Sequence, residues 1–596
     1  MRSLNMQIKE LNTKNIIVLT VLFVSTIYVL TINGKCEPVF TVLAVFFFRW
    51  LYSIYEKKIK NWKTKLLCGG YAVLLGAAFI VGKGVVFNGD CAGSYIVNYI
   101  VAPKTDNIIE WICLSILIYL VTSCLAIACN SVKITIGMDK INMKSDKIWW
   151  GMSTIVILLA WLPHLLSYYP GVIIGDSLSS IGQALGSEPL SNHFPIVYTF
   201  FIKACMEVGI AVTDNINVGI FIYTFIQYVI MAVIAGYVVF WLKSRGVNKW
   251  ICLMTATFYA LCGLFAGYAV SMWKDPLFGA VGTLLVLYCL DIVISKGSVL
   301  TEIGFLLKWN LVCVFLLFWR NNGLYIVAAL GIIIVFLYRK YKKRLFVISF
   351  IFIIIIFEII TGPIYDKLKI EKDTIVESMA IPIQQIAGVV VSDADLTKEQ
   401  EEVLFQILPE EEWKCYTPAL VDRIKFHDQF NDSYFNEHVG DFLKIWAELL
   451  VPNLKTYVKS YLMETIGYWH PTMFNGAGYF YSSGMTENEF GVYTTDLWEK
   501  WFGKPILPIL NENRNFICSG ALAWIILLGF VLTVAKKYKG MSLGIMPALL
   551  LWGTVLIATP IAFSLRYVFL WAFGLPIFLM IPFMSREEEK LDSELK

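Results

Sequence analysis

Charged residues are scarce in this chain. Asp, Glu, Lys and Arg make up only 16% of its 596 residues, whereas hydrophobic residues make up 58%. Soluble domains carry about a quarter charged residues, so this chain has too few polar groups to cover a water-exposed surface of its size. The deficit excludes the string of soluble domains that the length alone would suggest.

A disulfide framework and a metal-ligand spacing are also missing. The thirteen cysteines are scattered, mostly within apolar runs, and only Cys415 falls in the long polar segment of the chain. Disulfide scaffolds and zinc sites need cysteines at regular or paired spacings. There is no cleavable signal peptide, internal repeat or low-complexity tract, so the first apolar run is expected to act as a signal anchor.

The chain instead contains many long apolar runs. Runs of about 18 or more apolar residues predict membrane-spanning helices, and their number predicts an all-α polytopic membrane protein. With both termini on one side the number of spans must be even, so we expect about 14, with residues 194–212 half-embedded or re-entrant. The candidate spans are roughly 16–33, 38–54, 66–86, 108–130, 149–167, 194–212, 217–241, 249–271, 276–294, 307–320, 323–338, 345–361, 517–536, 541–559 and 564–583.

Short basic loops set the expected orientation. Loops rich in lysine and arginine remain cytoplasmic, which predicts cytoplasmic N- and C-termini and an external polar segment at 363–515. The scattered cysteines and the Lys- and Ile-rich composition favour a bacterial plasma membrane. The basic loops are 56–65, 133–147, 339–344 and 536–539.

Four regions follow from this pattern. The external segment is expected to be a small, mostly helical domain, because 393–413 has capping residues at its start and Pro409 at its end, and 434–469 is amphipathic with a break at Pro452. The regions are a four-helix extension at 1–148, a transmembrane core at 149–362 with an external loop at 167–195, the external domain at 363–515, and C-terminal helices with an acidic tail at 516–596.

The loop "SYYPGVIIGDSLSSIGQALGSEPLSNHFP" at 167–195 interrupts the apolar pattern with an aspartate, a histidine, three prolines and four glycines. Leu178, Ile181 and Leu185 fall at helical spacing, which is typical of a short helix lying in the membrane interface. Asp176, just before them, has two interpretations. It caps this helix, as aspartates often do, or it is a catalytic base that faces outward at membrane level.

Other ionisable residues occur at the same predicted face, at or near helix ends. Ionisable groups at membrane depth are costly and mark a site or a buried pair. Because these residues come from distant parts of the chain, they predict one shared pocket, in which the basic groups would neutralise a phosphate and Arg would do so with bidentate geometry. They are His193, Lys274 with the adjacent Asp275, Arg320 and Arg566.

The external domain ends in a loop that is crowded with aromatic residues, "GYWHPTMFNGAGYFYSS" at 467–483. Trp469 and Tyr479 in this loop are candidates for stacking on the faces of a sugar. The alternative is that they belong to an aromatic belt at the membrane interface.

The strings "YYPGVIIGDSLSSIGQALG", "SNHFPIVYT", "WKDPLFG", "RNNGL" and "LRY" resemble those of an uncharacterised bacterial group of GT-C-like membrane glycosyltransferases. The resemblance covers about 149–583 and implies a GT-C-like fold with an external site. It implies that Asp176 is a base or a metal ligand. Unlike the common GT-C pattern, no second acidic residue adjoins Asp176; Asp275 could complete a site for Mg²⁺ or Mn²⁺, but Lys274 is an equally good partner for it.

The function that the resemblance implies is transfer of a sugar from a polyprenyl-phosphate donor to a glycan, lipid or protein acceptor of the cell envelope. Asp176 would be catalytic, and His193, Lys274, Arg320, Arg566, Trp469 and Tyr479 would bind substrate. Two alternatives use the same charges. One is a transporter or flippase of a lipid-linked or anionic solute, and the other is an envelope polymer ligase. Membrane lipids are expected partners, and nucleic acids are not.

Overall fold

The computed structural model is almost entirely helical, with only four short strands among the residues it describes. Every apolar run predicted from the sequence coincides with a helix or a bent pair of helices. The described residues are 13–32, 37–58, 61–83, 85–88, 95–98, 104–138, 143–339, 344–372, 374–472, 485–512, 517–536, 539–559, 561–562 and 564–586.

The number of spans differs from the expected fourteen. Eight of the described helices are long and apolar enough to cross a membrane, and two bent pairs raise the number to ten at most. The other apolar helices have only 10 to 17 residues, short of the ~20 that a bilayer core needs. The chain is therefore a multi-pass helical membrane protein with fewer full-length spans than apolar runs.

The N-terminal helices form a module that also packs on α25 Ser519–Ala535 through α4 and α5. Small apolar clusters join α2, α3 and α5, and α4 packs along α5. The sequence between α4 and α5 contains an antiparallel strand pair. The elements are α2 Thr13–Ile32, α3 Pro38–Lys58, α4 Trp62–Val81, β1 Val86–Asn88, β2 Tyr95–Asn98 and α5 Thr105–Ser131.

The central bundle is built around α12, which is buried along almost its whole length. It packs against α9, α13 and α27, while α6 and α8 pack on α9. The bundle elements are α6 Met143–Ser167, α7 Asp176–Leu185, α8 Ile196–Thr213, α9 Ile216–Ser244, α10 Lys249–Leu261, α11 Gly263–Ala269, α12 Lys274–Ile294, α13 Ile303–Trp319, α14 Gly323–Leu337 and α15 Arg344–Ile359.

Residues 375–464, which we call the polar domain, have a separate hydrophobic core. The helix predicted within 393–413 is confirmed but is shorter, from Lys398 to Ile407, and of the two possible caps, Asp395 and Thr397, it is Thr397 that forms a capping box with Gln400. The predicted break near Pro452 separates two helices. The elements are η3 Ile375–Met379, α17 Ala380–Val391, α18 Lys398–Ile407, α19 Asp422–Lys425, α20 Asp432–Glu437, α21 Val439–Leu450 and α22 Leu454–Glu464.

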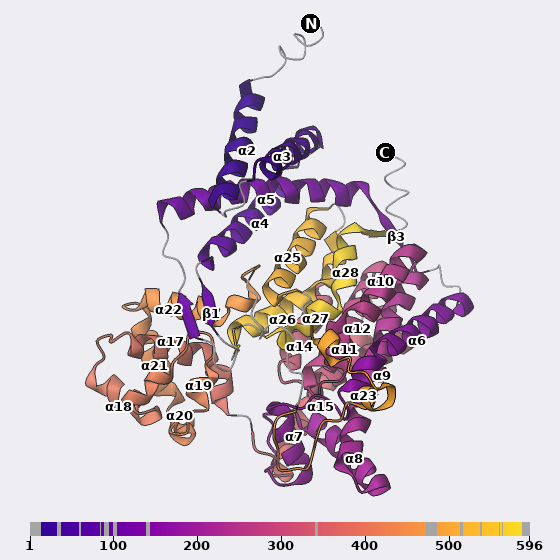
Figure 1. Cartoon of the computed structure of the whole chain (residues 1–596), viewed down its shortest axis with the longest axis vertical. Helices are drawn as coiled ribbons and strands as arrows, with labels where there is room; N and C mark the ends of the chain where they lie inside the picture. Colours follow the sequence, from indigo (N-terminus) through magenta and orange to yellow (C-terminus); the bar gives the residue numbers. More distant parts are fainter. Residues whose placement is uncertain are drawn as a thin grey trace, which may run out of the picture.

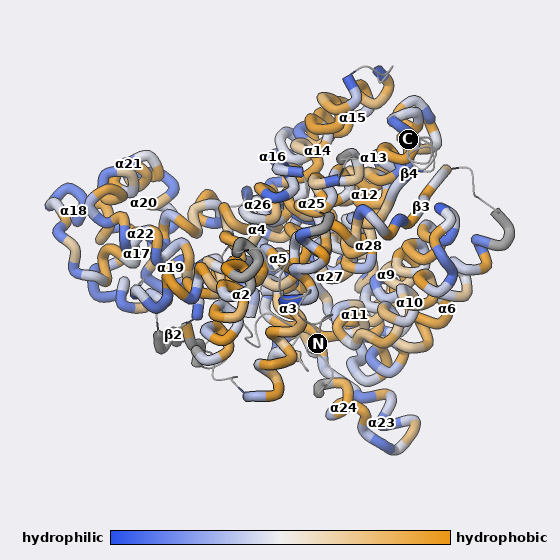
Figure 2. Tube along the Cα trace, turned by 90° about the horizontal axis from the view of Figure 1, so that it is seen from above, coloured by the Kyte–Doolittle hydropathy of each residue, from blue (hydrophilic) through white to orange (hydrophobic). Residues whose placement is uncertain are grey.

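The C-terminal helices return to the bundle, and β3 Ile134–Ile136 pairs in parallel with β4 Met584–Arg586. Figure 1 shows α7 and β3 at opposite ends of the bundle, with the polar domain at one side. In Figure 2, hydrophilic residues gather in α18–α21, whereas the bundle helices are mostly hydrophobic. The remaining elements are α16 Tyr365–Lys367, η5 Ile466–Tyr468, α23 Leu497–Phe502, α24 Leu507–Glu512, α25 Ser519–Ala535, α26 Met546–Ile557, η8 Leu565–Val568, α27 Phe569–Phe573 and α28 Leu575–Met580.

Candidate functional site

The polar segment before α7 is fixed between two other parts of the chain. Val172 exchanges two backbone hydrogen bonds with residues 270–272, at 2.9 and 3.0 Å. The N–H of Thr486 donates to the carbonyl of Ile173 at 2.9 Å. Gly175 has φ 25°, in the left-handed region that glycine adopts without a steric cost. The segment therefore holds Asp176 in a defined place, at the first residue of α7.

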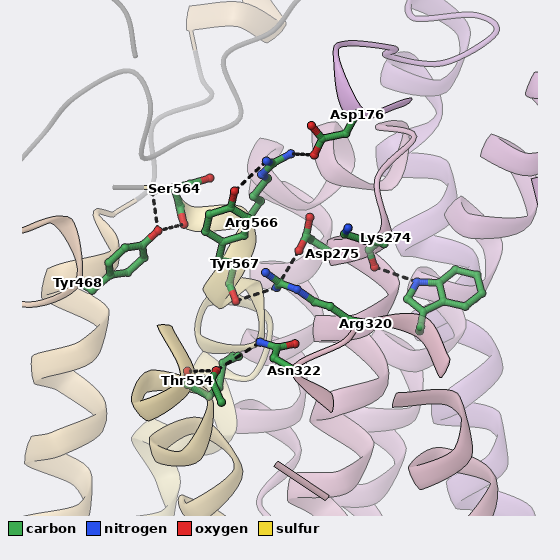
Figure 3. Close-up of polar contacts among 12 residues, drawn as sticks. Asp176, Lys274, Asp275, Arg320, Asn322, Tyr468, Thr554, Ser564, Arg566 and Tyr567 are labelled. Atoms are coloured by element: carbon green, nitrogen blue, oxygen red, sulfur yellow. Dashed lines mark hydrogen bonds and ion pairs between the residues drawn. The ribbon is translucent and has the colours of Figure 1, made fainter. Parts of the chain in front are cut away.

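Asp176 points at Arg566 and not at the backbone of its own helix (Figure 3). Its Oδ2 lies 2.6 Å from Nη1 of Arg566. The N-cap of α7 is Gly175, and this helix start has no side-chain capping bond. The capping interpretation of Asp176 is therefore wrong. The Asp176 side chain is 43% exposed and that of Arg566 is 15% exposed, so the pair lies at the mouth of the site.

Lys274 and Asp275 begin α12 directly after a non-helical stretch. Buried backbone without helical partners needs other hydrogen bonds in a membrane protein. The side-chain amide of Gln227 on α9 donates to three carbonyls of residues 268–271, at 2.6 to 3.2 Å. The hydroxyl of Ser177 on α7 donates to the carbonyl of Met272 at 2.7 Å. These bonds fix the start of α12, and with it both charged side chains.

Arg320 follows the last residue of α13 and reaches the same point. Its Nη1 lies 2.7 Å from Oδ1 of Asp275, which is almost completely buried. The two residues after it anchor the turn. Asn321 donates to the carbonyl of Asn192 at 3.2 Å, and Asn322 donates to a hydroxyl on α26 at 3.3 Å.

Tyr567 joins the two arginines. Its ring centroid lies 4.9 Å from the guanidinium carbon of Arg320 and 4.8 Å from that of Arg566. Its hydroxyl accepts from Arg566 at 2.9 Å, and its carbonyl accepts from Arg320 at 3.2 Å. The ring of Trp273 lies on another side of Arg566, at 5.3 Å. Such cation–π contacts stabilise a desolvated guanidinium.

The charged residues lie at a small cavity of about 10 Å³. A cavity of this volume holds about one water molecule, so the head of a larger ligand enters it only when the surrounding side chains move apart. The cavity is lined by Asp176, Ser180, Phe194, Tyr198, Trp273, Lys274 and Asp275.

Lys274 differs from the two arginines. The residues that the structure describes provide carboxylate partners for Arg320 and Arg566 but no ion pair for Lys274. Its Nζ lies 3.5 Å from the carbonyl oxygen of His193 and 4.7 Å from the ring centroid of Phe194. Its ammonium group is therefore the cation that is available to a ligand in the cavity.

The balance of charge favours an anion over a metal ion. Two carboxylates face three cations, and both carboxylates are ion-paired with arginines. A divalent cation bound to Asp176 and Asp275 would have to displace both arginines and sit beside Lys274. Within the described ranges, no group of three or more His, Cys, Asp and Glu side chains is arranged to hold a metal. The donor set does not fit Mg²⁺ or Mn²⁺.

The surroundings of Asp176 keep it ionised. Burial raises the pKa of its carboxyl, but the positive charges of Arg566 and Lys274 and the hydrogen bond from Arg566 outweigh burial and lower it below the usual value. A carboxylate with a lowered pKa is a poor proton acceptor near neutral pH.

Residues 186–595 match DUF6020, a family of unknown function, and this match covers more than half of the chain. The chain belongs to this family. No curated protein and no solved structure matches it. Lys274, Asp275, Arg320 and Arg566 lie within the DUF6020 match, whereas Asp176 and the helices α2–α7 lie before its first residue.

The other predicted substrate-binding residues of this DUF6020 chain are not all at the cavity. His193 lies beside it, through its carbonyl contact with Lys274. Trp469 lies elsewhere: its indole N–H donates to residues of α22, and its carbonyl accepts from Trp524 on α25. The structure therefore does not place Trp469 in the pocket. Tyr479 lies outside the described residues.

The aromatic part of the site was not predicted from the sequence. Tyr567 directly follows Arg566, and Trp273 directly precedes Lys274. Their positions next to predicted site residues were the sequence feature that could have identified them. Phe194 and Tyr198 line the cavity from the predicted re-entry at 194–212. No sequence signal pointed to α19 of the polar domain, which also approaches the site.

Proposed function

We propose that this DUF6020 protein is a membrane glycosyltransferase that moves a sugar from a polyprenyl-phosphate donor to a cell-envelope acceptor on the external face. One observation carries the proposal. A small pocket lies at one end of an apolar bundle; the two carboxylates that line it are paired with arginines, and its Lys274 has no ion pair among the described residues. A lipid-linked phosphate has this chemistry, with an anionic head and an apolar tail. The resemblance to GT-C enzymes supports the same assignment.

The cations act on the leaving group in this proposal. The acceptor oxygen bonds to the anomeric carbon of the sugar, and the bond from that carbon to the phosphate oxygen breaks with its electron pair. The phosphate then carries one more negative charge than before. Lys274 and Arg566 stabilise this charge, and fixed cations in a partly desolvated site do so without reorganisation. Arg320 is held by Asp275 and by the carbonyl of Tyr567. It does not contact the phosphate in this proposal but adds to the positive electrostatic potential at the site.

Asp176 is a positioning residue on the donor side. It holds Arg566 before the donor arrives and takes it back when the phosphate product leaves. The sequence-based prediction that Asp176 is also the base is less favourable, because its ion pair with Arg566 lowers its pKa.

A transporter or flippase is the second candidate, and one observation favours it. Two helix pairs are bent, α10–α11 by 57° and the pair Leu565–Phe573 and Leu575–Phe583 by 52°. The first precedes Lys274 and the second contains Arg566. Broken helices beside a charged site are typical of secondary transporters.

A transfer assay separates the two candidates. Purified protein in lipid nanodiscs is mixed with a polyprenyl-phosphate sugar and an acceptor extract, and the released polyprenyl phosphate is measured. We expect release that depends on the acceptor and that falls at least tenfold in Lys274→Met. A transporter in the same nanodiscs would bind the donor but release no polyprenyl phosphate. Mass spectrometry of envelope glycans from a deletion strain would then identify the product.

A further inference from the structure

The polar domain reaches the candidate site through the chain around α19. The N–H of Ala562 donates to the carbonyl of Ala419 at 3.0 Å, and Leu420 pairs with Ile561 in an antiparallel bridge. Arg566 follows only four residues after Ala562. Figure 1 shows α19 on the side of the polar domain that faces the bundle. Residues at the start of α19 therefore lie beside the segment that carries the donor-side arginine.

Asp422, the first residue of α19, belongs to a small charged cluster. The Lys425 ammonium, only 1% exposed, lies 3.1 Å from Oδ1 of Asp422 and 2.8 Å from Oε2 of Glu377. One cation is shared between two carboxylates, so the cluster has an excess of negative charge. Asp422 itself is 26% exposed. Its carboxylate is held in place by a buried lysine but remains open to a substrate.

Asp422 lies two residues after Leu420, which pairs with Ile561 next to the membrane site. Its carboxylate is near enough to interact electrostatically with Asp176 on α7 and with Tyr567 on η8. It interacts in addition with the buried Glu464 of α22. One carboxylate from the membrane loop and one from the polar domain therefore influence each other across the contact between α19 and the 561–566 segment.

The surroundings of these two carboxylates drive their pKa values in opposite directions. Arg566 and Lys274 lower the pKa of Asp176. Burial is the largest cause that raises the pKa of Asp422; Lys425 opposes it, and the negative charges of Glu377 and Asp176 add to it, so that the pKa ends above its usual value. Two carboxyl groups in one site with separated pKa values usually have different roles, one ionised throughout and one that takes and gives a proton.

We propose that Asp422 is the general base of the reaction, which accepts the proton of the acceptor hydroxyl, while Asp176 remains ionised and exchanges Arg566 with the donor phosphate. This assignment rests on the proposed glycosyltransferase function. The acceptor O–H bond breaks and its proton passes to the Asp422 carboxylate. The oxygen forms the new bond to the anomeric carbon, and the electron pair of the broken carbon–oxygen bond leaves on the phosphate. Asp422 then returns the proton to water.

The acceptor is therefore a hydroxyl-bearing molecule that binds between α19 and the mouth of the cavity. Placing the base on the polar domain separates the two substrates. The donor arrives from the bilayer onto Lys274 and Arg566, and the acceptor arrives from the aqueous side onto Asp422.

The test is the pH dependence of sugar transfer in three full-length variants. Asp422→Asn should lower the transfer rate by about 10²–10⁴-fold, the usual contribution of a general base, and should remove the fall in rate at acid pH. Glu377→Gln keeps a hydrogen-bonding partner for Lys425 but removes a negative charge that raises the pKa of Asp422, so the acid limb should move to lower pH. Glu411→Gln, an exposed change in the same domain, should leave the profile in place.

Melting curves and donor binding distinguish the role from a folding effect. All three variants should melt near the wild-type temperature and bind polyprenyl phosphate with unchanged affinity. The assignment is overturned if Asp422→Asn is stable and its transfer rate still falls at acid pH as in the wild type. It is also overturned if the acid limb of the Glu377→Gln pH profile lies at the wild-type pH. A wild-type protein that binds the donor but transfers no sugar would overturn the proposed function itself, and with it the role of Asp422.

Discussion

Asp176 holds Arg566 through a 2.6 Å ion pair, so any phosphate that uses Arg566 must first displace a carboxylate. Asp176→Asn removes this competitor and keeps the shape of the side chain. We expect the affinity for polyprenyl phosphate to rise by up to about tenfold, or ~1.4 kcal/mol. Turnover should fall, because asparagine lacks the negative charge that displaces the phosphate product from Arg566, so product release becomes slower. Binding titrations in nanodiscs and steady-state rates measure the two effects separately.

The outcome of Asp176→Asn also decides between two roles for this residue. If Asp176 were the base, its loss would lower the rate by about 10²–10⁴-fold and remove the acid limb of the pH profile. If Asp176 is the exchange partner of Arg566, its loss keeps the acid limb but moves it to lower pH, because a negative charge that raises the pKa of Asp422 is removed. A variant with wild-type turnover and wild-type affinity would leave Asp176 as a passive ion pair.

Arg566 is expected to depend on the planar geometry of its guanidinium. It contacts Asp176 and the hydroxyl of Tyr567 at once, and its face lies against Trp273. A lysine keeps the charge but loses the fork and the stacking. Arg566→Lys should therefore weaken donor binding tenfold or more.

The bundle supplies a matched control for Arg566→Lys. Arg245 makes an equally close pair with Asp291, at 2.7 Å, and a second bond at 3.0 Å through its Nε, yet it follows the end of α9 that lies beside β3. Arg245→Lys should lower the melting temperature and leave donor affinity unchanged. Equal donor affinity in wild type and Arg566→Lys would contradict the phosphate role of Arg566.

At the residue scale, the sequence was informative about charge and uninformative about pairing. Asp176, Lys274, Arg320 and Arg566 stand out because charged residues are rare in apolar surroundings. Which carboxylate pairs with which arginine depends on how α7, α12 and η8 meet, and that is a tertiary property. For the same reason Asp422 was not predicted: in a polar segment, one more aspartate carries no signal.

At the scale of elements, α4 is joined to the loop after η5 by a close contact. A Cβ added to Gly82, the C-cap of α4, would lie 1.9 Å from the ring of His470, which is buried. Gly82 has φ −92°, so alanine suits its backbone and only the contact opposes it. Gly82→Ala should destabilise the protein by about 1–3 kcal/mol, the usual cost of overpacking.

Gly70 is the matched control for Gly82. It lies inside α4 and has open space where a Cβ would be. Gly70→Ala should be neutral or stabilising by roughly 0.5–1 kcal/mol, since alanine favours a helix. Thermal melting of both variants in the same detergent tests the pair. Equal melting temperatures would show that the N-terminal module does not depend on this contact.

His470 also makes this contact sensitive to pH. Burial lowers the pKa of His470 from 6.5 to about 4. The unfolded chain therefore takes up the proton first, so stability is complete above pH 6.5 and is lost as the pH falls towards 4. The loss should be on the order of 3 kcal/mol. His470→Gln should flatten this part of the melting-temperature profile, and an unchanged slope would exclude His470 as its cause.

Element ends could be predicted only in part from local chemistry. Asp395 and Thr397 were the two possible caps for α18, and Thr397 is the residue that caps it. The bend of 52° falls at Gly574 and Pro576, residue types that interrupt helices, and the bend of 57° lies between α10 and α11; neither bend was predicted from the sequence. The count of fourteen spans failed because apolar composition does not report how many residues of a run stay helical.

At the scale of the whole molecule, the two ends of the bundle differ chemically. The α7 end carries the Asp176–Arg566 pair and Lys274, and the polar domain approaches it through α19. Figure 1 places β3 at the opposite end, and the segment that contains β3 is one of the basic loops. The sequence anticipated this asymmetry through its basic loops, although the contact between α19 and the 561–566 segment could only come from the folded chain.

The chemical difference between the two ends of the bundle predicts how the protein is oriented in the membrane. Basic loops favour the cytoplasmic side, so the β3 end should face the cytoplasm and the polar domain should face outward, where an enzyme that acts on the cell envelope needs it. In a cysteine-free background, Lys444→Cys on α21, 74% exposed in the native side chain, should react with an impermeant thiol reagent in intact cells. Lys249→Cys, at the exposed start of α10, should react only after the membrane is opened. The reverse pattern would place the cavity on the cytoplasmic side, where external transfer to an envelope acceptor is impossible, and the proposed function would have to be abandoned even if every residue contact described above were correct.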